Sequence, residues 1–185
     1  MEKEKLVSSS GANTNDSIIL TKGIFIEGTS ILAREKEDIL KQKGFSNEFI
    51  KRCKDFLFNP GISIYNEATI SNDNFLLTSM HDLTEGGLFC GLAEIAIASD
   101  LGLLIKKEQI NVLPEPLELS KVFEINPYST ISSGSLLISI NNEFAEGLIN
   151  LLRKNGISSG VIGYFTSEKE ECLILEKRPL KMQNR

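Results

Sequence analysis

The 185-residue sequence has no tryptophan, a single histidine and only three cysteines. Cys53, Cys90 and Cys172 are odd in number, lie far apart and form no CxxC pair, and one histidine is too few to complete a zinc site with them. These counts argue against a disulfide framework or a zinc domain. They favour three buried, reduced thiols in a cytoplasmic protein.

Several common sequence signals are also missing. The chain has no GxxxxGK[ST] phosphate loop, no GxSxG elbow and no acidic cluster suited to magnesium. No apolar run approaches the roughly 20 residues of a membrane span, and the amino terminus lacks the apolar core of a signal peptide. The net charge is −5 and the basic residues are scattered, which argues against a nucleic-acid partner. We therefore expect a cytoplasmic protein with no membrane or nucleic-acid partner.

The chain length suits one domain. We expect a flexible arm at 1–15, the domain at 16–178 and a tail at 179–185. Short apolar runs predict strands at 17–21, 75–80, 102–106, 135–140, 160–166 and 172–176, the last two as a closing pair. Helical spacing predicts helices at 29–43, 46–57, 62–70, 88–98, 116–124 and 142–155. Strands interleaved with helices predict an α/β sandwich of α+β character, in which helices cover a mixed β-sheet.

The segment before the predicted helix at 88–98 carries the sharpest local signal. Gly86 and Gly87 permit unusual backbone angles, and a helix start offers unpaired N–H groups that favour an anion. Thr84 adds a hydroxyl, so these residues predict a phosphate cradle. The alternative is that the glycines only allow the helix to pack closely on the sheet. That helix is apolar nearly all round, so we expect burial on most sides and a hydrogen-bonding partner for Glu94, its only charge.

Four further features are candidates for the same cleft. On a strand, His81 and Asp82 would point to opposite faces. His81 could orient a phosphate or exchange a proton, and Asp82 could act on a substrate. For both residues, a structural hydrogen-bonding role is the alternative.

The other two features are small-residue turns. Lys22, followed by Glu27, Gly28 and Thr29, forms a second turn that enters a helix, and an ordinary helix cap explains it equally well. The turn that ends in Ser133 and Gly134 offers hydroxyls and flexible backbone before a strand. An ordinary serine-rich turn is its alternative.

The string HDLTEGGL at 81–88, which runs into GLAEIAIASDLGL, resembles HypE-like members of the aminoimidazole-ribonucleotide (AIR) synthetase superfamily, also called PurM-like. Four more segments are similar to this family in the same order and spacing. They are SIILTKGIFIEGTSILARE at 17–35, FLFNPGISI at 56–64, INPYSTISSGSLLISI at 125–140 and VIGYF at 161–165. The resemblance covers about residues 11 to 178.

This resemblance implies a carboxy-terminal domain of the PurM type. Family members pair two α/β domains, and their amino-terminal domain forms the dimer and holds ATP and Mg²⁺. That domain has no counterpart in this sequence, so the resemblance implies that ATP chemistry is not complete in this chain alone. The carboxy-terminal domain closes over the cleft with its glycine loop, which here comprises His81, Asp82, Thr84, Glu85, Gly86 and Gly87. Lys22, Glu27–Thr29, Ser133 and Gly134 are weaker candidates for the same cleft.

The expected function is therefore that of one domain of an ATP-dependent ligase-like, kinase-like or dehydratase-type enzyme, with hydrogenase maturation as one context. Members that convert a carbamoyl group to a thiocyanate end in a tail with a cysteine, whereas this chain ends in RPLKMQNR. That difference argues against this conversion and, with the ISSG version of the later turn, indicates a HypE-related branch of undefined substrate. The alternative is a non-catalytic assembly module that docks on a partner chain.

Overall fold

The computed structural model describes residues 6–169 and 172–175 of the chain. Its centre is a six-stranded sheet in the order β2-β4-β1-β5-β3-β6. All neighbouring strands are antiparallel except β3 and β6, which are parallel. The strands are β1 (Ser17–Thr21), β2 (Ser79–Leu83), β3 (Gly102–Lys106), β4 (Ser135–Ile140), β5 (Ser159–Thr166) and β6 (Cys172–Leu175). This architecture confirms the predicted mixed sheet covered by helices.

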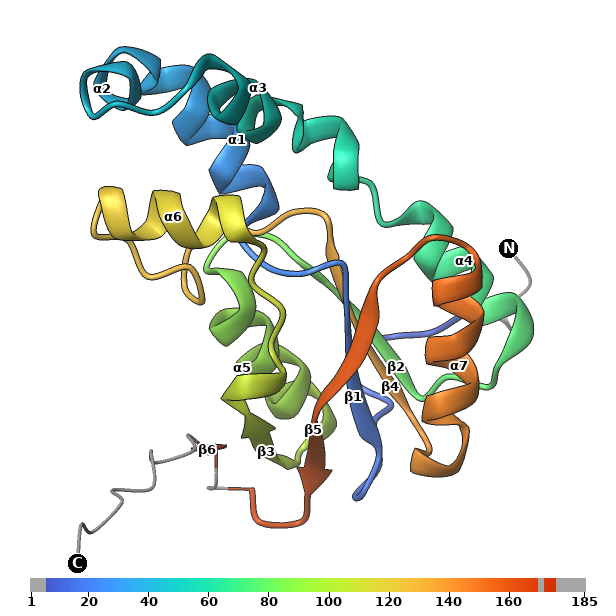
Figure 1. Ribbon diagram of the computed structural model, residues 1–185. Coiled ribbons are helices and arrows are strands. Elements are labelled where there is room, and N and C mark those ends of the chain that lie inside the picture. Colours follow the sequence, from blue (N-terminus) through green and yellow to red (C-terminus); the bar gives the residue numbers. More distant parts are fainter. Residues whose placement is uncertain (1–5, 170–171, 176–185) are drawn as a thin grey trace, which may run out of the picture.

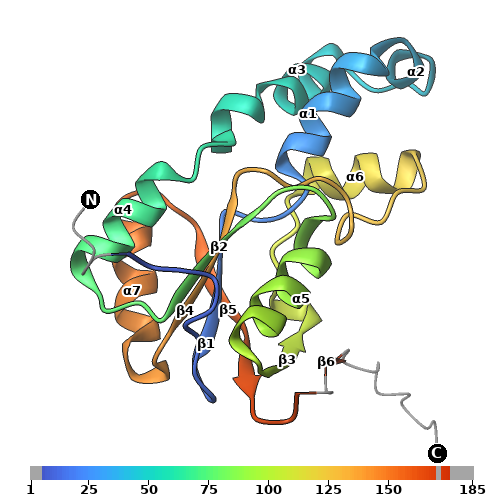
Figure 2. The same ribbon diagram turned by 180° about the vertical axis from the view of Figure 1, so that it is seen from behind.

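Helices cover the sheet on both faces, and a separate group lies beyond one end of the strands (Figure 1). The helices are α1 (Ile26–Glu35), α2 (Glu37–Gln42), α3 (Asn47–Asp55), α4 (Tyr65–Asn74), α5 (Gly87–Ser99), α6 (Pro114–Val122) and α7 (Asn142–Lys154). Two short turns, η2 (Leu57–Gly61) and η3 (Lys107–Gln109), connect them to their neighbours. The view from behind shows α5 on one side of the sheet and α4 with α7 on the other (Figure 2).

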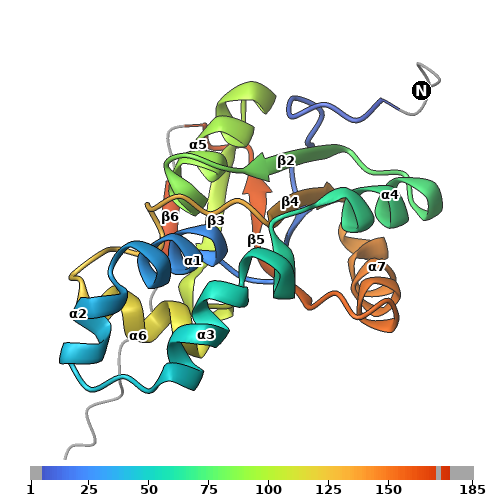
Figure 3. The ribbon, with the colours of Figure 1, turned by 90° about the horizontal axis from the view of Figure 1, so that it is seen from above.

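Alternation along β1 divides the core into two layers. Ile18 and Leu20 point to the face covered by α5, whereas Ile19 points to the face covered by α7. Both faces are therefore apolar, which explains why SIILT is buried at every position. A third cluster joins α1, α2, α3 and α6 around Leu40 and Cys53, and these helices gather together in the view from above (Figure 3).

Three sequence predictions differ from this fold. The strands at the carboxy-terminal end do not pair with each other, because β3 lies between β5 and β6. The strand expected at 75–80 begins only at Ser79, and Leu76 before it is 91% exposed. The helix expected at 29–43 is interrupted at Lys36, whose φ of −119° is not helical.

Helix α5 also departs from expectation. Its inner face is buried through Leu88, Leu92 and Ile95. Its outer face is exposed, with Ile97 79% exposed and the Cys90 side chain open to solvent. The prediction of burial on most sides is therefore wrong for α5, and so is the prediction of a buried Cys90. Nothing in an all-apolar run marks which side the sheet will leave uncovered.

Cys53 is buried as predicted, and burial raises the pKa of its thiol to about 12. The side chain of Cys172 lies outside the part of the chain that the structure describes.

The segment around Ser8 to Gly11, within the predicted arm, lies along the outer edge of β2. The Met80 amide donates to Ser8 O at 3.2 Å, and Ala12 is buried in the core on the α5 face. Gly11 lies so close to Thr78 that a Cβ atom there would be 2.2 Å from the Thr78 carbonyl oxygen. Residues 1–5 and the predicted tail at 179–185 lie outside the described residues.

Candidate functional site

The antiparallel register brings the predicted site segments to one edge of the sheet. Leu83, the last residue of β2, lies opposite Ser135, the first residue of β4, and the neighbouring β1 ends at Thr21. The turns beyond these residues are joined through Ser132. Its hydroxyl accepts from the Phe25 amide at 2.8 Å, and its amide donates to Thr84 O at 3.1 Å. Three segments distant in sequence therefore meet at this edge through buried hydrogen bonds.

Lys22 lies in the first of these turns, where it is buried. Its ammonium group is 2.8 Å from Glu67 Oε1 and donates to Ser63 O at 2.8 Å and to Gly61 O at 3.1 Å. The two carbonyl groups take two of its three N–H donors, and the contact with Glu67 is an ion pair. Lys22 therefore fixes the start of α4 to the end of β1, and its charge is already compensated.

The first turn of α1 is likewise buried, and its polar groups bond mostly within the turn. Thr29 Oγ1 donates to Phe25 O at 2.7 Å within the first turn of the helix. A Cβ atom on Gly28 would lie 2.3 Å from the Phe25 ring. Glu27 Oε2 is buried and has no hydrogen-bond partner in the described part of the chain. Thr29 and Gly28 serve the packing of this turn, while Glu27 presents an uncompensated acceptor.

The glycine loop is partly used by the fold. Gly86 and Gly87 both have left-handed φ values, 77° and 64°. The Gly87 amide donates to Thr84 O at 3.3 Å and the Phe89 amide to Tyr128 O at 2.9 Å. A Cβ atom on Gly87 would lie 2.4 Å from Thr130 O, so Gly87 also permits close packing. Thr84, Glu85 and Gly86 are exposed, and these three residues form the accessible part of the loop.

His81 lies on β2 and takes part in a chain of side chains on the α5 side. Its Nδ1 is 3.0 Å from Ser9 Oγ, and its Nε2 is 2.8 Å from Glu94 Oε2. The Cys90 thiol donates to Glu94 Oε1 at 3.4 Å. This hydrogen bond and the glutamate charge raise the pKa of the exposed Cys90 thiol. Glu94 thus has the partner expected for it, and both ring nitrogens of His81 are engaged.

Asp82 follows His81 on β2, so strand alternation places its side chain on the opposite side of the strand. Partial burial is the main cause that raises the pKa of its carboxyl group. The charge of His81 opposes this rise, the charge of Glu67 adds to it, and Lys22 opposes it. Asp82 is therefore the carboxyl group at this edge whose proton affinity is raised.

The turn before β4 is held by close backbone packing. Gly134 has a φ of 107°, and a Cβ atom there would lie 2.7 Å from Gly61 O. Ser133 is partly exposed, whereas Ser132 is fully buried. Ser135 donates through its hydroxyl to Gly23 O. The connecting hydroxyls are therefore those of Ser132 and Ser135, on either side of the two residues predicted for this site.

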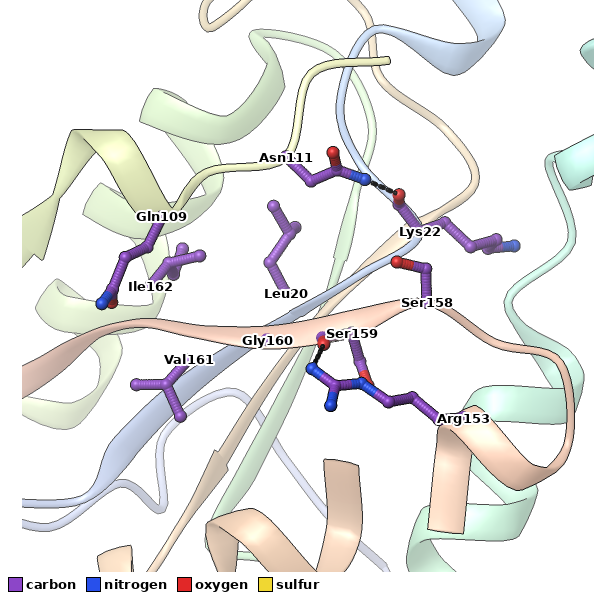
Figure 4. Close-up of a pocket in the computed structure, with 10 residues that line it drawn as sticks. All are labelled: Leu20, Lys22, Gln109, Asn111, Arg153, Ser158, Ser159, Gly160, Val161 and Ile162. Atoms are coloured by element: carbon purple, nitrogen blue, oxygen red, sulfur yellow. Dashed lines mark hydrogen bonds between the residues drawn. The ribbon is translucent and has the colours of Figure 1, made fainter. Parts of the chain in front are cut away.

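Two cavities flank Lys22, and sequence inspection did not find most of their residues. One, of about 330 Å³, lies between β5 and the segment after β3 (Figure 4). The other, of about 230 Å³, lies between η2, α4 and the turn before β5. Gln109, Asn111, Arg153 and Glu67 carried no local sequence signal. The run Ser158-Ser159-Gly160 at the start of a strand was the one visible cue.

Among residues 6–169 and 172–175, no group of three or more His, Cys, Asp or Glu side chains is arranged to hold a metal ion. No helix in this same part of the chain is both long and apolar enough to cross a membrane.

The chain is similar in sequence to proteins about twice its length. A hydrogenase expression/formation protein of Methanocaldococcus jannaschii is 24% identical over 176 residues, which are 94% of this chain and 49% of that protein. The chain therefore spans about half the length of this relative.

Solved structures share the fold. Escherichia coli HypE superposes with a TM-score of 0.71 at 17% identity, covering 95% of this chain and 54% of HypE. A hydrogenase maturation protein HypE in complex with ATP superposes with a TM-score of 0.60 at 18% identity, covering 87% of this chain and 45% of that protein. Residues 13–176 match the family described as AIR synthase related protein, C-terminal domain. The chain belongs to this family.

Proposed function

We propose that the chain is the acceptor-facing half of an ATP-using enzyme related to HypE, in which ATP and Mg²⁺ are held mainly by an amino-terminal domain. The observation that carries this proposal is the convergence of the turns after β1, after β2 and before β4 at one sheet edge. Family membership supports it, and so does the ATP bound to a HypE of the same fold. Homodimerisation of the full-length form and a role in hydrogenase maturation are part of the same proposal.

The residues of this edge divide into two roles. Thr84, Glu85 and Gly86 are exposed and would contact the ligand. Asp82 would exchange a proton, because its raised pKa brings its protonated form closer to neutral pH. His81 would position β2 against α5, since both of its ring nitrogens have partners.

The residues fit ATP and Mg²⁺ to different degrees. Thr84 and Glu85 offer polar side chains to a nucleotide or an acceptor, whereas two amides at the start of α5 already have acceptors. The described residues contain no group that would hold Mg²⁺ by themselves. The proposal therefore assigns this chain the acceptor side of the cleft, and when bound, Mg²⁺ would neutralise phosphate charge from the other domain.

Reconstitution tests this function. ATP hydrolysis would be measured for this chain, for an AIR synthase-related amino-terminal half from the same organism, and for their mixture. We expect the mixture to form ADP at least about tenfold faster than the two separate rates combined, because effects of this size follow from correctly placed catalytic groups. Thr84→Ala combined with Glu85→Gln should remove most of that gain.

Glu35→Gln provides the matched control, because Glu35 is an exposed glutamate at the far end of α1. A mixture no faster than its parts would contradict the proposal, and so would equal losses in the loop variant and the control. Gly86 is a poor position for this test. A Cβ atom there would lie 2.6 Å from Cys90 Cβ, so its substitution would disturb the start of α5 itself.

The second candidate is a non-catalytic assembly module that docks on a partner chain. The exposed apolar side of α5 favours it, with Ile97 79% exposed. Under this hypothesis Ile97→Asp should abolish complex formation with the amino-terminal half in analytical ultracentrifugation. If ATP turnover in the mixture survives Thr84→Ala with Glu85→Gln but complex formation needs Ile97, the module hypothesis gains and the acceptor-facing role of the loop fails.

A further inference from the structure

The sheet is covered unevenly on its α7 face. Tyr164 of β5 lies opposite Ser17 of β1 and Leu104 of β3 in the strand register, so these three side chains share one face. The Ser17 hydroxyl donates to Asn142 Oδ1 at 2.8 Å, which identifies that face as the one beneath α7. Helix α7 packs on β1 and β5, whereas β3 packs on α5 at the opposite face. Tyr164 and Leu104 are therefore only partly buried.

A hollow of about 440 Å³ lies along the flank of α7 that borders β5. Strand β5 contributes Val161 to its lining, and all other lining residues belong to α7. The α7 residues recur at intervals of three or four positions, which places them on one side of the helix. They are Asn142, Ala145, Glu146, Ile149, Asn150 and Arg153.

This stripe carries one anion and one cation, and both charges are uncompensated. Glu146 and Arg153 are exposed, and neither has an ion-pair partner among residues 6–169 and 172–175. They lie about two helical turns apart, roughly 10 Å along the axis, which is too far for them to pair with each other. Arg153 Nη2 donates to Ser159 O at 3.3 Å, and the guanidinium keeps further N–H donors for a carboxylate.

A second copy of α7 has the charges that this stripe requires. In a two-fold symmetric dimer, residue i of one copy contacts residue j of the other, and j contacts i. Two α7 helices laid antiparallel, with the axis near Ile149 and Asn150, bring Glu146 of each copy opposite Arg153 of the other. One two-fold axis therefore forms two identical ion pairs, and the stripe is complementary to itself.

We infer that this chain forms a symmetric homodimer in which α7 pairs antiparallel with α7 of a second copy. Val161, Leu104 and Tyr164 beside the helix add partly exposed apolar surface for the second copy to cover. The dimer is weak, because exposed ion pairs contribute little and Ala145 and Ile149 are already buried in their own core. The contact uses this domain alone and does not depend on the ATP-related function proposed above.

Sedimentation velocity of the full chain tests this inference. We expect a reversible dimer between about 5 and 500 µM, a range typical of weak complexes. Glu146→Arg would set two cations opposite each other at both pairs, and Arg153→Glu would set two anions there. Each variant should raise the dimer Kd at least about tenfold, because like charges across an interface oppose association. The double variant Glu146→Arg with Arg153→Glu restores opposite charges and should return the Kd to within about threefold of the unmodified chain.

Glu143→Arg is the matched control. Glu143 is an exposed glutamate of α7 that does not line the hollow, and its substitution changes the net charge as Glu146→Arg does. It should change the dimer Kd less than about twofold, because it alters no pair across the axis. Melting temperatures would verify that each variant is folded. If Arg153→Glu is not, Glu146→Arg and the double variant still decide the question, since Glu146 makes no ion pair within the described residues.

Three results would overturn the inference. They are a chain that stays monomeric at the highest concentration, equal losses of affinity in Glu146→Arg and Glu143→Arg, and a folded double variant that dimerises no better than Glu146→Arg. None of these measurements involves ATP turnover or an amino-terminal half, so their failure is distinguishable from failure of the reconstitution experiment.

Discussion

Two turns at the same sheet edge use similar sequences in opposite ways. The turn after β1, from Lys22 to Thr29, is buried and tied by side chains to η2, α4 and the turn before β4. The turn after β2, from Thr84 to Gly87, is held by backbone hydrogen bonds and exposes three of its four residues. Both join a strand to a helix through glycine. A helix entry that contains glycine can therefore be buried and structural, or exposed and accessible. Which of the two it becomes depends on the elements that pack over it.

The largest expected effect on stability is at Lys22, in the buried turn after β1. Lys22→Met would leave Glu67 buried without its cation, and removal of one partner of such a pair costs about 3–5 kcal/mol. We expect that loss in the free energy of unfolding, measured by urea denaturation. The double variant Lys22→Met with Glu67→Leu should recover most of it. If Lys22→Met alone leaves the free energy of unfolding unchanged, the contacts of Lys22 do not stabilise the fold.

The next largest loss of stability is expected at Gly87, in the turn after β2, where the backbone is closely packed. Gly87→Ala combines a left-handed φ of 64° with a Cβ atom 2.4 Å from Thr130 O. We expect a loss of about 2–4 kcal/mol from the strained conformation and the overpacking together. Gly44→Ala is the control, because Gly44 has a φ of 86° but nothing within 4 Å of the added atom. Equal losses at the two positions would show that close packing contributes nothing at Gly87.

A smaller effect concerns the thiol beside the exposed turn. Glu94 raises the pKa of Cys90, so the reactive thiolate is scarce near neutral pH. Glu94→Gln should lower this pKa and speed alkylation of Cys90 by iodoacetamide severalfold, measured by mass spectrometry. Buried Cys53, with a pKa raised to about 12, should stay unmodified in the folded protein and serves as the internal reference. An unchanged alkylation rate would separate Cys90 from Glu94.

The smallest expected effect is the pH dependence of stability that Asp82 causes. A carboxyl group whose folded pKa is raised binds its proton more tightly in the folded than in the unfolded state. Its ionisation therefore destabilises the fold as the pH rises from the ordinary aspartate value through the raised one. Asp82→Asn should stabilise the protein at pH 7, and this difference should vanish as the pH falls below the ordinary value. Thermal melts between pH 3 and pH 7, on the order of half-unit steps, would measure it. A difference independent of pH would contradict the assignment.

Local sequence was sufficient for some elements and insufficient for others. The strands at 17–21, 102–106 and 135–140 have the predicted bounds, because apolar runs of this length are stable only as buried strands here. The apolar run FLL at 75–77 predicted the strand too early in the chain. The strand forms farther on, where β4 and residues 8–9 supply hydrogen-bond partners. The pairing of β6 with β3 depends on contacts between segments about 70 residues apart, which no local pattern records.

The family and the alternation of strands and helices follow from the sequence alone, because apolar periodicity is a local property, and glycines at helix entries indicated the segments of the candidate site. Only the tertiary structure decided which of these segments are accessible. The sequence makes Lys22 a candidate for the cleft, whereas the structure buries its ammonium group in an ion pair with Glu67 and in hydrogen bonds to two carbonyl groups. Arg153 and Ser159 line a cavity at the part of β5 that does not pair with β3. Accessibility and charge compensation arise from residues far apart in the chain, so they follow from packing rather than from local sequence.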